Sequence, residues 1–308
     1  MILCCGEALI DFVPLPGKRA YQPCPGGSVF NIAVGLGRLD ITVSFFCKMS
    51  TDFFSDMLLD HLVENNVDTS MCLRVPNPTT LAFVSLDNSE GTEPQFSFYA
   101  NDSADRSLTI SDLPSCIPDE VKVMHFGSIS IVLEPGAIAL EALMAREQGN
   151  RVISLDPNVR PNLIPDREVY RQRFENWLSS VDLLKLSLAD REWIYPKLGL
   201  DECLKCWFDR GVSLVIQTRG GEGAEAFTSD GENAFVETPK VKVADTVGAG
   251  DTFIAATLAY LTEEDLLEKD HLSRLDGHQL SGVLSFASRA AAINCTRVGA
   301  DPPFRYEI

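Results

Sequence analysis

The amino-acid sequence predicts an α/β protein in which a mostly parallel central sheet has helices on both faces, with a small β lid. Short β-rich runs alternate with longer helical runs along most of the chain, a pattern typical of βαβ units. Runs such as VISLD and SLVIQ are almost continuously apolar, as expected for strands that helices cover on both sides. With 308 residues and 45% hydrophobic composition, the chain is long enough to bury a large core.

The alternation can be followed from the first residues onward. ILCC at 2–5 is a strand pattern, and SVFNIAVGLGRL at 28–39 has the period of an amphipathic helix. The later runs repeat this order: VSFFCKM (43–49) then FSDMLLDHLVEN (54–65), VKVMHFG (121–127) then EPGAIALEALMAREQ (134–148), and the strands RVISLD (151–156), DLLKLS (182–187) and SLVIQT (213–218).

One segment breaks this alternation. Residues 72–105 contain two strand-like runs of period two, joined by a turn rich in Gly, Pro, Asn and Asp, which predicts a hairpin. The segment 13–24 can join it. The hairpin is either an antiparallel edge of the main sheet or a lid over a site at the strand ends. We therefore expect one domain over 1–308, with a lid formed by about 13–24 and 72–105.

The charge excludes several classes of partner. With 26 basic and 44 acidic residues, the formal charge is −18, which repels nucleic acids and anionic membranes. The start MILCCGEALIDF lacks a basic region, and no stretch approaches the roughly 20 apolar residues that span a bilayer. A cytoplasmic protein without nucleic-acid or membrane partners is expected.

The nine cysteines do not predict a disulfide framework, since several lie in apolar runs. Cys203 and Cys206 form a C-x-x-C pair, but their surroundings follow a helical pattern and offer no second pair of ligands. Packing on a helix is the expected role, with metal or redox use as the alternative.

The most informative stretch is DTVGAGDTF at 245–253. It matches neither the dinucleotide nor the Walker-type phosphate loop. Its small residues Gly248, Ala249 and Gly250 would let main-chain amides converge on an anion at the start of a helix. Asp251 would then lie beside that anion, either as a base in phosphoryl transfer or simply as the N-cap of the helix.

Other polar residues are candidates for the same site, each with a structural alternative. Asn31 follows the pair Gly26 and Gly27 on the first helix, where it binds a ligand or satisfies a backbone group. Asp11 is expected to end the first strand, GEALIDF, at the edge where open α/β sheets bind ligands, or to form a turn. Arg160 follows a buried strand and could hold a phosphate or a hydroxyl.

Taken together, these motifs resemble the two signatures of the ribokinase-like carbohydrate kinases, the PfkB family. G-G-x-x-x-N lies in the first third of the chain and D-T-x-G-A-G-D near residue 250. Between them lie DPNVR (156–160), DLLKLSLAD (182–190) and QTRGGEG (217–223). The stretch QTRGGEG resembles the family's nucleotide turn. The resemblance covers nearly the whole chain.

This resemblance implies an ATP-dependent kinase that uses Mg²⁺, with potassium as the usual monovalent activator. Asp251 would be the base and the amides of Gly248, Ala249 and Gly250 the anion hole. The implied sugar ligands are Asp11, Gly26, Gly27, Asn31 and Arg160. The implied nucleotide contacts are Lys185, Thr218, Gly220, Gly223, Gly248, Gly250 and Ser288. The implied monovalent-cation ligands are Asp245, Val247, Asn294, Arg297 and Gly299, of which the last three would offer backbone carbonyls.

The chain departs from the family at one motif. Many members carry N-x-x-E where this chain has Ser187 and Asp190. That region organises magnesium and its waters in the family, so Asp190 would act through a water, or Glu192 would replace it if the register differs by two.

Within the family, three stretches look most similar to bacterial fructokinases: the N-terminal GEALIDF and PGGSVFNIAVGLGRLD, and the later run FSFYANDSADRSL. Phe98 and Tyr99 would cover the sugar ring or pack within the hairpin. The expected reaction is transfer of the γ-phosphoryl group of ATP to O6 or O1 of fructose. Open alternatives are 2-keto-3-deoxygluconate, ribose, tagatose or a nucleoside as substrate, and a non-catalytic sensor. A homodimer through the lid is also open, because an edge strand either pairs with a second chain or stays solvated.

Overall fold

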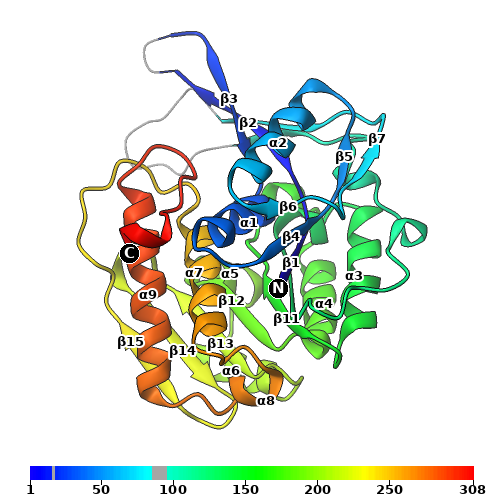
Figure 1. The fold of residues 1–308 in the computed structure, drawn as a ribbon. Coiled ribbons are helices and arrows are strands. Elements are labelled where there is room, and N and C mark those ends of the chain that lie inside the picture. The colour runs from blue at the N-terminus through cyan, green and yellow to red at the C-terminus, as the bar shows by residue number, and fades with distance from the viewer. Residues whose placement is uncertain (16–17, 85–95) are drawn as a thin grey trace.

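In a computed structural model of the chain, residues 1–15, 18–84 and 96–308 are described. Within these ranges a nine-stranded sheet forms the core, with the strand order β15-β14-β13-β12-β11-β10-β1-β4-β6 (Figure 1). Every neighbouring pair from β6 to β13 is parallel, whereas β14 and β15 are antiparallel additions at one edge. In sheet order the strands are β15 (Asn233–Val236), β14 (Ala224–Thr228), β13 (Leu214–Thr218), β12 (Leu183–Ser187), β11 (Val152–Asp156), β10 (Val123–Gly127), β1 (Ile2–Cys5), β4 (Val43–Phe46) and β6 (Val67–Asp68).

Helices cover both faces of this sheet, and the expected mostly parallel α/β core is confirmed. One face packs on α1 (Ser28–Arg38), α2 (Phe53–Glu64), α7 (Ala249–Glu263), α8 (Lys269–Leu272) and α9 (Gly277–Cys295). The other packs on α3 (Gly136–Glu147), α4 (Arg167–Trp177), α5 (Leu188–Ile194) and α6 (Leu200–Phe208).

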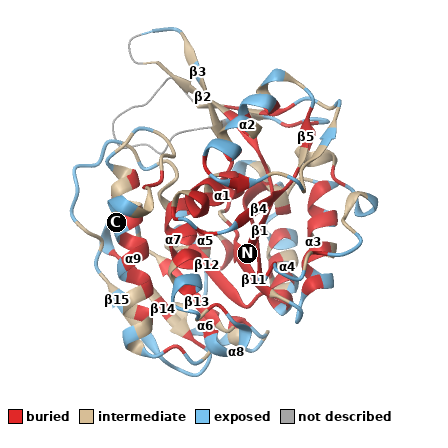
Figure 2. Ribbon diagram, viewed as in Figure 1, coloured by how far each residue is buried: buried red, intermediate tan, exposed pale blue. Residues whose placement is uncertain are grey.

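The two apolar cores follow from the alternation of side chains along each strand. In β1, Ile2 and Cys4 lie in the core beneath α1 and α7, whereas Leu3 and Cys5 lie in the core beneath α3 and α4. Strands with both faces covered are therefore mostly apolar, with buried polar exceptions such as Ser44, His125 and Gln217. Figure 2 shows the central strands and the inward faces of the helices as buried. Cys203 and Cys206 both lie on α6, with Cys203 buried in the second core.

A second, four-stranded sheet rises above the carboxyl ends of the main strands, in the order β3-β2-β8-β9 (Figure 1). It consists of β2 (Leu9–Pro14), β3 (Tyr21–Gly26), β8 (Thr80–Val84) and β9 (Phe96–Tyr99). β8 and β9 pair antiparallel, and the turn between them lies outside the described residues. Because this sheet is separate from the main one, the alternative of an edge hairpin on the main sheet is wrong.

The sequence pattern predicts one strand over residues 43–49, but the structure divides this run into two strands. β4 ends at Phe46, and after Cys47 the chain leaves the main sheet as β5 (Lys48–Ser50), which pairs in parallel with β7 (Leu73–Val75). The apolar pattern continues through the break because both short strands are largely buried. Within the run 72–79, the strand Leu73–Val75 thus belongs to this small sheet rather than to the four-stranded one.

No helix in the described part of the chain is long and apolar enough to cross a membrane.

The packing of α4 predicts how unevenly substitutions in one helix will act. Phe174 is completely buried against Trp177 and Tyr195, whereas Val169 on the same helix is 53% exposed. Phe174→Ala should lower the free energy of unfolding by about 3–5 kcal/mol, because it removes buried surface and leaves a cavity. Val169→Ala, the matched control, should change it by less than about 1 kcal/mol. Urea unfolding followed by circular dichroism measures both, and equal effects would contradict this packing.

Candidate active site

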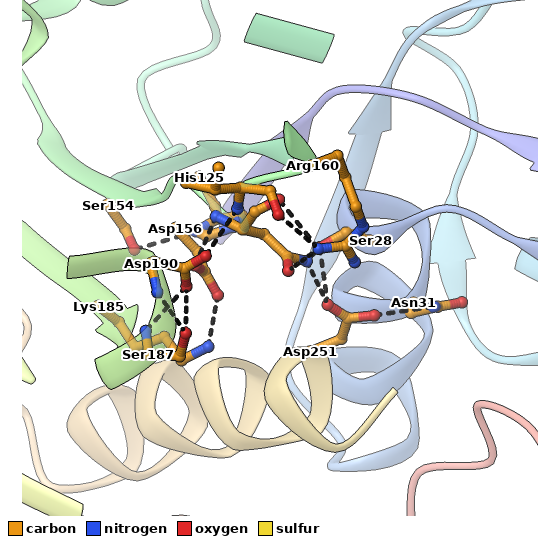
Figure 3. A network of polar contacts seen from close by, with 12 residues as sticks. Ser28, Asn31, His125, Ser154, Asp156, Arg160, Lys185, Ser187, Asp190 and Asp251 are labelled. Carbon is orange, nitrogen blue, oxygen red and sulfur yellow. Dashed lines mark hydrogen bonds and ion pairs between the residues drawn. The ribbon is translucent and has the colours of Figure 1, made fainter. Parts of the chain in front are cut away.

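Polar side chains meet where the parallel strands end and two helices begin (Figure 3). The loop after β11 carries Asn158 and Arg160, β12 contributes Lys185, and α1 and α7 begin beside them. Open α/β sheets bind ligands at this edge, because the strand ends and the following helix termini leave polar groups without partners there. Side chains from distant parts of the sequence thus converge on one place.

The carboxylate of Asp251 is the centre of this network. It is 7% exposed and accepts hydrogen bonds from Ser28 Oγ at 2.7 Å and Asn31 Nδ2 at 2.9 Å. Burial raises the pKa of Asp251, while the bonds from Asn31 and Ser28 and the charges of Lys185 and Arg160 act in the opposite direction. The N-cap of α7 is Gly248, so the alternative that Asp251 merely caps its helix is wrong. Asn31 likewise binds this carboxylate rather than a backbone group.

The glycine turn before α7 has the geometry that its small residues suggested. Gly248 has φ of 75°, and an added Cβ there would lie 2.6 Å from the Cβ of Ala300, so a side chain is excluded on two counts. The amide of Ala249 donates to the carbonyl of Thr246. Within the described chain, the amides of Gly248, Gly250 and Asp251 have no such acceptor. These three amides are free to meet an anion, whereas the amide of Ala249 is already occupied.

A buried ion pair lies beside this turn. Lys185 Nζ is 2.6 Å from Asp156 Oδ2, and both side chains are at least 96% buried. Burial lowers the pKa of Lys185, but the charge and hydrogen bond of Asp156, helped by Asp190 and Asp251, raise it overall. An added Cβ on Gly250 would lie 3.2 Å from Lys185 Nζ. A fixed positive charge is thus held directly beside the free amides.

The loop after β11 connects Asp251 to Arg160. Asn158 Nδ2 donates to Ser28 Oγ at 2.8 Å and lies 3.4 Å from Asp251 Oδ1. Its Oδ1 accepts from Arg160 Nη1 at 2.7 Å. Asn158 has φ of 37°, a conformation that costs energy for a residue with a side chain. The loop is therefore held in a strained shape that places its amide among the polar groups of the site.

Asp11 does not end the first strand, contrary to the expectation from GEALIDF. β1 ends at Cys5, and Asp11 lies within β2 of the second sheet, opposite Cys24. Its carboxylate lies over Gly26, where an added Cβ would be 2.2 Å from Oδ2. Burial and the charge of Asp251 raise the pKa of Asp11 to about 7, while Arg160 lowers it. Asp11 is therefore near enough to Asp251 and Arg160 for their charges to act on its carboxyl group.

Phe98 lies on the face of the second sheet that carries Asp11, since both align with Ala82 across the strands. It packs against a small buried cluster of Leu9, Ala82 and Ile129. Tyr99 points to the other face and is 65% exposed. Only Phe98 of this pair is directed toward the core.

The expected nucleotide turn follows β13, next to the end of β12. Thr218 pairs with Ser187 across the two strands. Gly220 has φ of 55° and Gly223 has φ of 144°, and an added Cβ at Gly223 would lie 2.4 Å from the carbonyl oxygen of Val236. Ser288 is buried in α9, and its approach to a nucleotide base stays a prediction.

The residues assigned to a monovalent cation come together from the loop before α7, the last turn of α9 and the loop after it. Asp245 accepts hydrogen bonds from the amides of Val247 and Gly299, and Asn294 Nδ2 donates to the carbonyl of Val247. The carbonyl of Asn294 accepts from the amide of Arg297. This oxygen-rich cluster fits a hard cation in its donor chemistry, although several of its oxygens already accept protein hydrogen bonds.

Asp190 has a structural role at the start of α5. One carboxylate oxygen accepts from Ser187 in a capping box at the start of α5, and the other accepts from the amide of Val159. The side chain of Glu192 is 64% exposed and lies 3.6 Å from Arg191. Among the residues that the structure describes, no group of three or more His, Cys, Asp and Glu side chains could hold a metal ion.

Sequence reasoning missed Ser28 and Asn158. Ser28 lies three residues before Asn31, so both share one helix face, a spacing that could have indicated it. Asn158 lies inside DPNVR, but its contact with Asp251 spans 93 residues and depends on the fold.

Comparison with known proteins supports the same chemistry. A family model described as pfkB family carbohydrate kinase matches residues 1–305. A fructokinase from Rhizobium leguminosarum bv. trifolii is 41% identical over 283 residues, which cover 91% of this chain and 85% of that protein.

Two solved structures share the fold. The structure of fructokinase from Xylella fastidiosa with bound ATP has a TM-score of 0.88 and 30% identity, covering 97% of this chain and 93% of that one. Fructokinase from Vibrio cholerae O395, solved with fructose, ADP and calcium, has a TM-score of 0.84 and 26% identity, covering 97% and 94%. The predicted ribokinase-like fold class and the family resemblance are confirmed, and the chain belongs to the pfkB family of carbohydrate kinases.

Proposed function

We propose that this protein is a fructokinase, which transfers the γ-phosphoryl group of ATP to a primary hydroxyl of fructose. The observation that carries the proposal is the Asp251 carboxylate, buried at the first turn of α7 directly beside free backbone amides. An acceptor for a hydroxyl proton thus lies next to a site for a transferring phosphate. The similarity to fructokinases selects fructose among the sugars.

In this proposal the sugar lies between the second sheet and the end of the main sheet. Asp11 approaches from β2, while Asn31 and Arg160 approach from the core, which gives both acceptors and donors for sugar hydroxyls. The Phe98 ring lies on the same face of the sheet as Asp11. The second sheet would act as a lid that excludes water from the reaction, as the sequence suggested.

Different groups of this chain would accept the proton, bind the phosphoryl group and supply positive charge. Asp251 accepts the proton of the attacking hydroxyl, and the amides of Gly250 and Asp251 receive oxygens of the transferring phosphoryl group. Lys185 adds positive charge beside those amides and stays protonated because Asp156 is its partner. In a loose transition state such positioning and charge contribute more than proton removal does.

Magnesium would accompany the nucleotide and neutralise charge between its phosphates. It usually retains several waters and takes few protein ligands, so Asp190 or Glu192 would act through water. Asp245, Val247, Asn294, Arg297 and Gly299 would together hold potassium behind the glycine turn. A homodimer through the lid stays a prediction. The face of that sheet opposite Asp11 carries the stacked rings of Phe12 and Phe83, 4.5 Å apart, and the exposed Tyr99.

A substrate panel tests the assignment. We expect ADP release that depends on fructose, measured by a coupled assay across fructose, ribose, tagatose, 2-keto-3-deoxygluconate and nucleosides. Replacing potassium chloride by tetramethylammonium chloride should lower the rate. Turnover of a nucleoside or of the keto-deoxy acid in place of fructose would overturn the proposal, and a lack of turnover with every acceptor would favour a sensor.

Replacing the base should separate chemistry from nucleotide binding. Asp251→Asn keeps the size of the side chain but cannot accept the proton, so kcat should fall by about 10²- to 10⁴-fold. ATP affinity, measured by calorimetry, should change little. Asp265→Asn, beyond the other end of α7, is the control and should retain wild-type kcat. Near wild-type turnover in Asp251→Asn would remove Asp251 from the mechanism.

The raised pKa of Asp251 predicts the pH profile. The carboxylate acts as a base only when ionised, so kcat/KM falls as pH drops through its pKa. Because burial raises that pKa, the acidic limb should lie above the ordinary aspartate value of about 3.9. In Asp11→Asn the limb should persist at a lower kcat/KM, since Asp251 is still present. A limb that disappears in Asp11→Asn would assign the titration to Asp11.

A further inference from the structure

Glu7 lies at the junction where the chain passes from the main sheet into the second sheet, between the end of β1 at Cys5 and the start of β2 at Leu9. It is 1% exposed, which is unusual for a glutamate. Burial raises its pKa to about 7, although its hydrogen bonds partly offset this effect. A buried carboxyl group at this place requires a partner that repays its desolvation.

That partner is the first turn of α1. Glu7 Oε1 accepts a hydrogen bond from the amide of Ser28 at 2.9 Å, across 21 residues of sequence. The N-cap residue of α1 is Gly27, which has no side chain to satisfy the free amides of the helix. Glu7 therefore supplies from another segment the cap that α1 lacks locally.

The fit between Glu7 and this turn is close. Gly27 has φ of 110°, and an added Cβ would lie 3.0 Å from the carbonyl oxygen of Glu7 and 3.2 Å from its Cγ. The backbone of the turn thus packs directly on Glu7. Little room is left for the turn to shift without moving that side chain.

The same turn holds the base. Ser28 is bound at both ends, since its amide donates to Glu7 and its hydroxyl donates to Asp251 Oδ1 at 2.7 Å. The Asn31 amide donates to the carbonyl of Gly27 at 2.8 Å, while its side chain donates to Asp251 Oδ2. Two hydrogen bonds to the Asp251 carboxylate therefore originate in a turn that Glu7 fixes.

We propose that Glu7 is a positioning residue of the kinase: its carboxyl group fixes the first turn of α1 and, through Ser28 and Asn31, the orientation of the Asp251 carboxylate. This inference rests on the proposed role of Asp251 as the base. Capping requires an acceptor oxygen at the right distance, which both the ionised and the protonated carboxyl group provide. The reach of the side chain matters, and its charge does not.

Two conservative variants separate reach from charge. Glu7→Gln keeps the length and an acceptor oxygen but removes the charge. Glu7→Asp keeps the charge but is one methylene shorter and cannot reach the Ser28 amide from the same backbone position. We expect kcat for fructose within about threefold of wild type in Glu7→Gln, and a fall on the order of 10- to 100-fold in Glu7→Asp. KM for ATP should stay nearly constant in both.

Asp166→Ala is the control for lost capping alone. Asp166 caps α4 through the amides of Glu168 and Val169, far from Asp251 in the sequence and exposed. This variant should lower the melting temperature and leave kcat unchanged.

If Glu7→Asp likewise changed only the melting temperature, Glu7 would have a purely structural role and the proposal would be wrong. A Glu7→Gln enzyme as impaired as Glu7→Asp, or more so, would also overturn it, because charge would then be the requirement. Should Glu7→Asp fail to fold, an impaired Glu7→Gln enzyme would still overturn the proposal.

A titration of Asp251 tests the inference without any substrate. Carbon-13 NMR of the aspartate carboxyls follows it, and the Asp251 signal is assigned by its absence in Asp251→Asn. Glu7→Asp should raise the pKa of Asp251, since hydrogen bonds from Ser28 and Asn31 favour its charged form. Glu7→Gln should leave it unchanged. The other charged groups that face Asp251 are common to all variants, namely Lys185, Arg160, Asp11 and Asp156. Identical titrations in all three proteins would refute the positioning role, whereas a wild type that phosphorylates no sugar would refute only the proposed function.

Discussion

The hydrogen bonds from Ser28 and Asn31 to the Asp251 carboxylate join the first turns of α1 and α7, which lie more than 200 residues apart in the chain. Both helices begin at the carboxyl edge of the main sheet, so the sheet brings their amino-terminal ends together. The rest of the site depends on this junction. The free amides of the glycine turn, the loop after β11 and the second sheet all take their positions around it.

Electrostatics explains why so many charged groups can be buried at one edge. Asp251 and Asp156 are buried and Asp11 is partly buried, and each would be costly alone. Lys185 pairs with Asp156, Arg160 is held by Asn158 where its charge acts on Asp11 and Asp251, and uncharged donors bind Asp251 directly. The arrangement keeps one carboxylate ready to accept a proton while cationic groups and amides remain available to a phosphate. Burying these charged groups lowers the stability of the fold in exchange for a preorganised site, as is common at active sites.

Much of the core could be predicted from sequence because strand and helix periodicity are local properties. The apolar runs of β11 and β13 and the amphipathic α1 are visible without any long-range information. DTVGAGDTF could be placed at a helix start for the same reason. Predictions failed where the fold, rather than the local pattern, decides. Asp11 was assigned to the first strand because nothing in GEALIDF marks the passage from one sheet to another.

The contacts of Glu7 and Asn158 could not be predicted for a related reason. Each acts on a segment far along the chain, and no spacing rule links a glutamate between two strands to an amide 21 residues later.

The central claim is that Asp251 accepts the proton while the neighbouring amides bind the phosphate. A crystal structure with fructose and a non-hydrolysable ATP analogue tests it most directly. It should place a primary fructose hydroxyl about 2.6–3.2 Å from the Asp251 carboxylate, with the terminal phosphate on the amides of Gly250 and Asp251. A fructose whose hydroxyls all lie away from Asp251, or a terminal phosphate bound elsewhere, would contradict it.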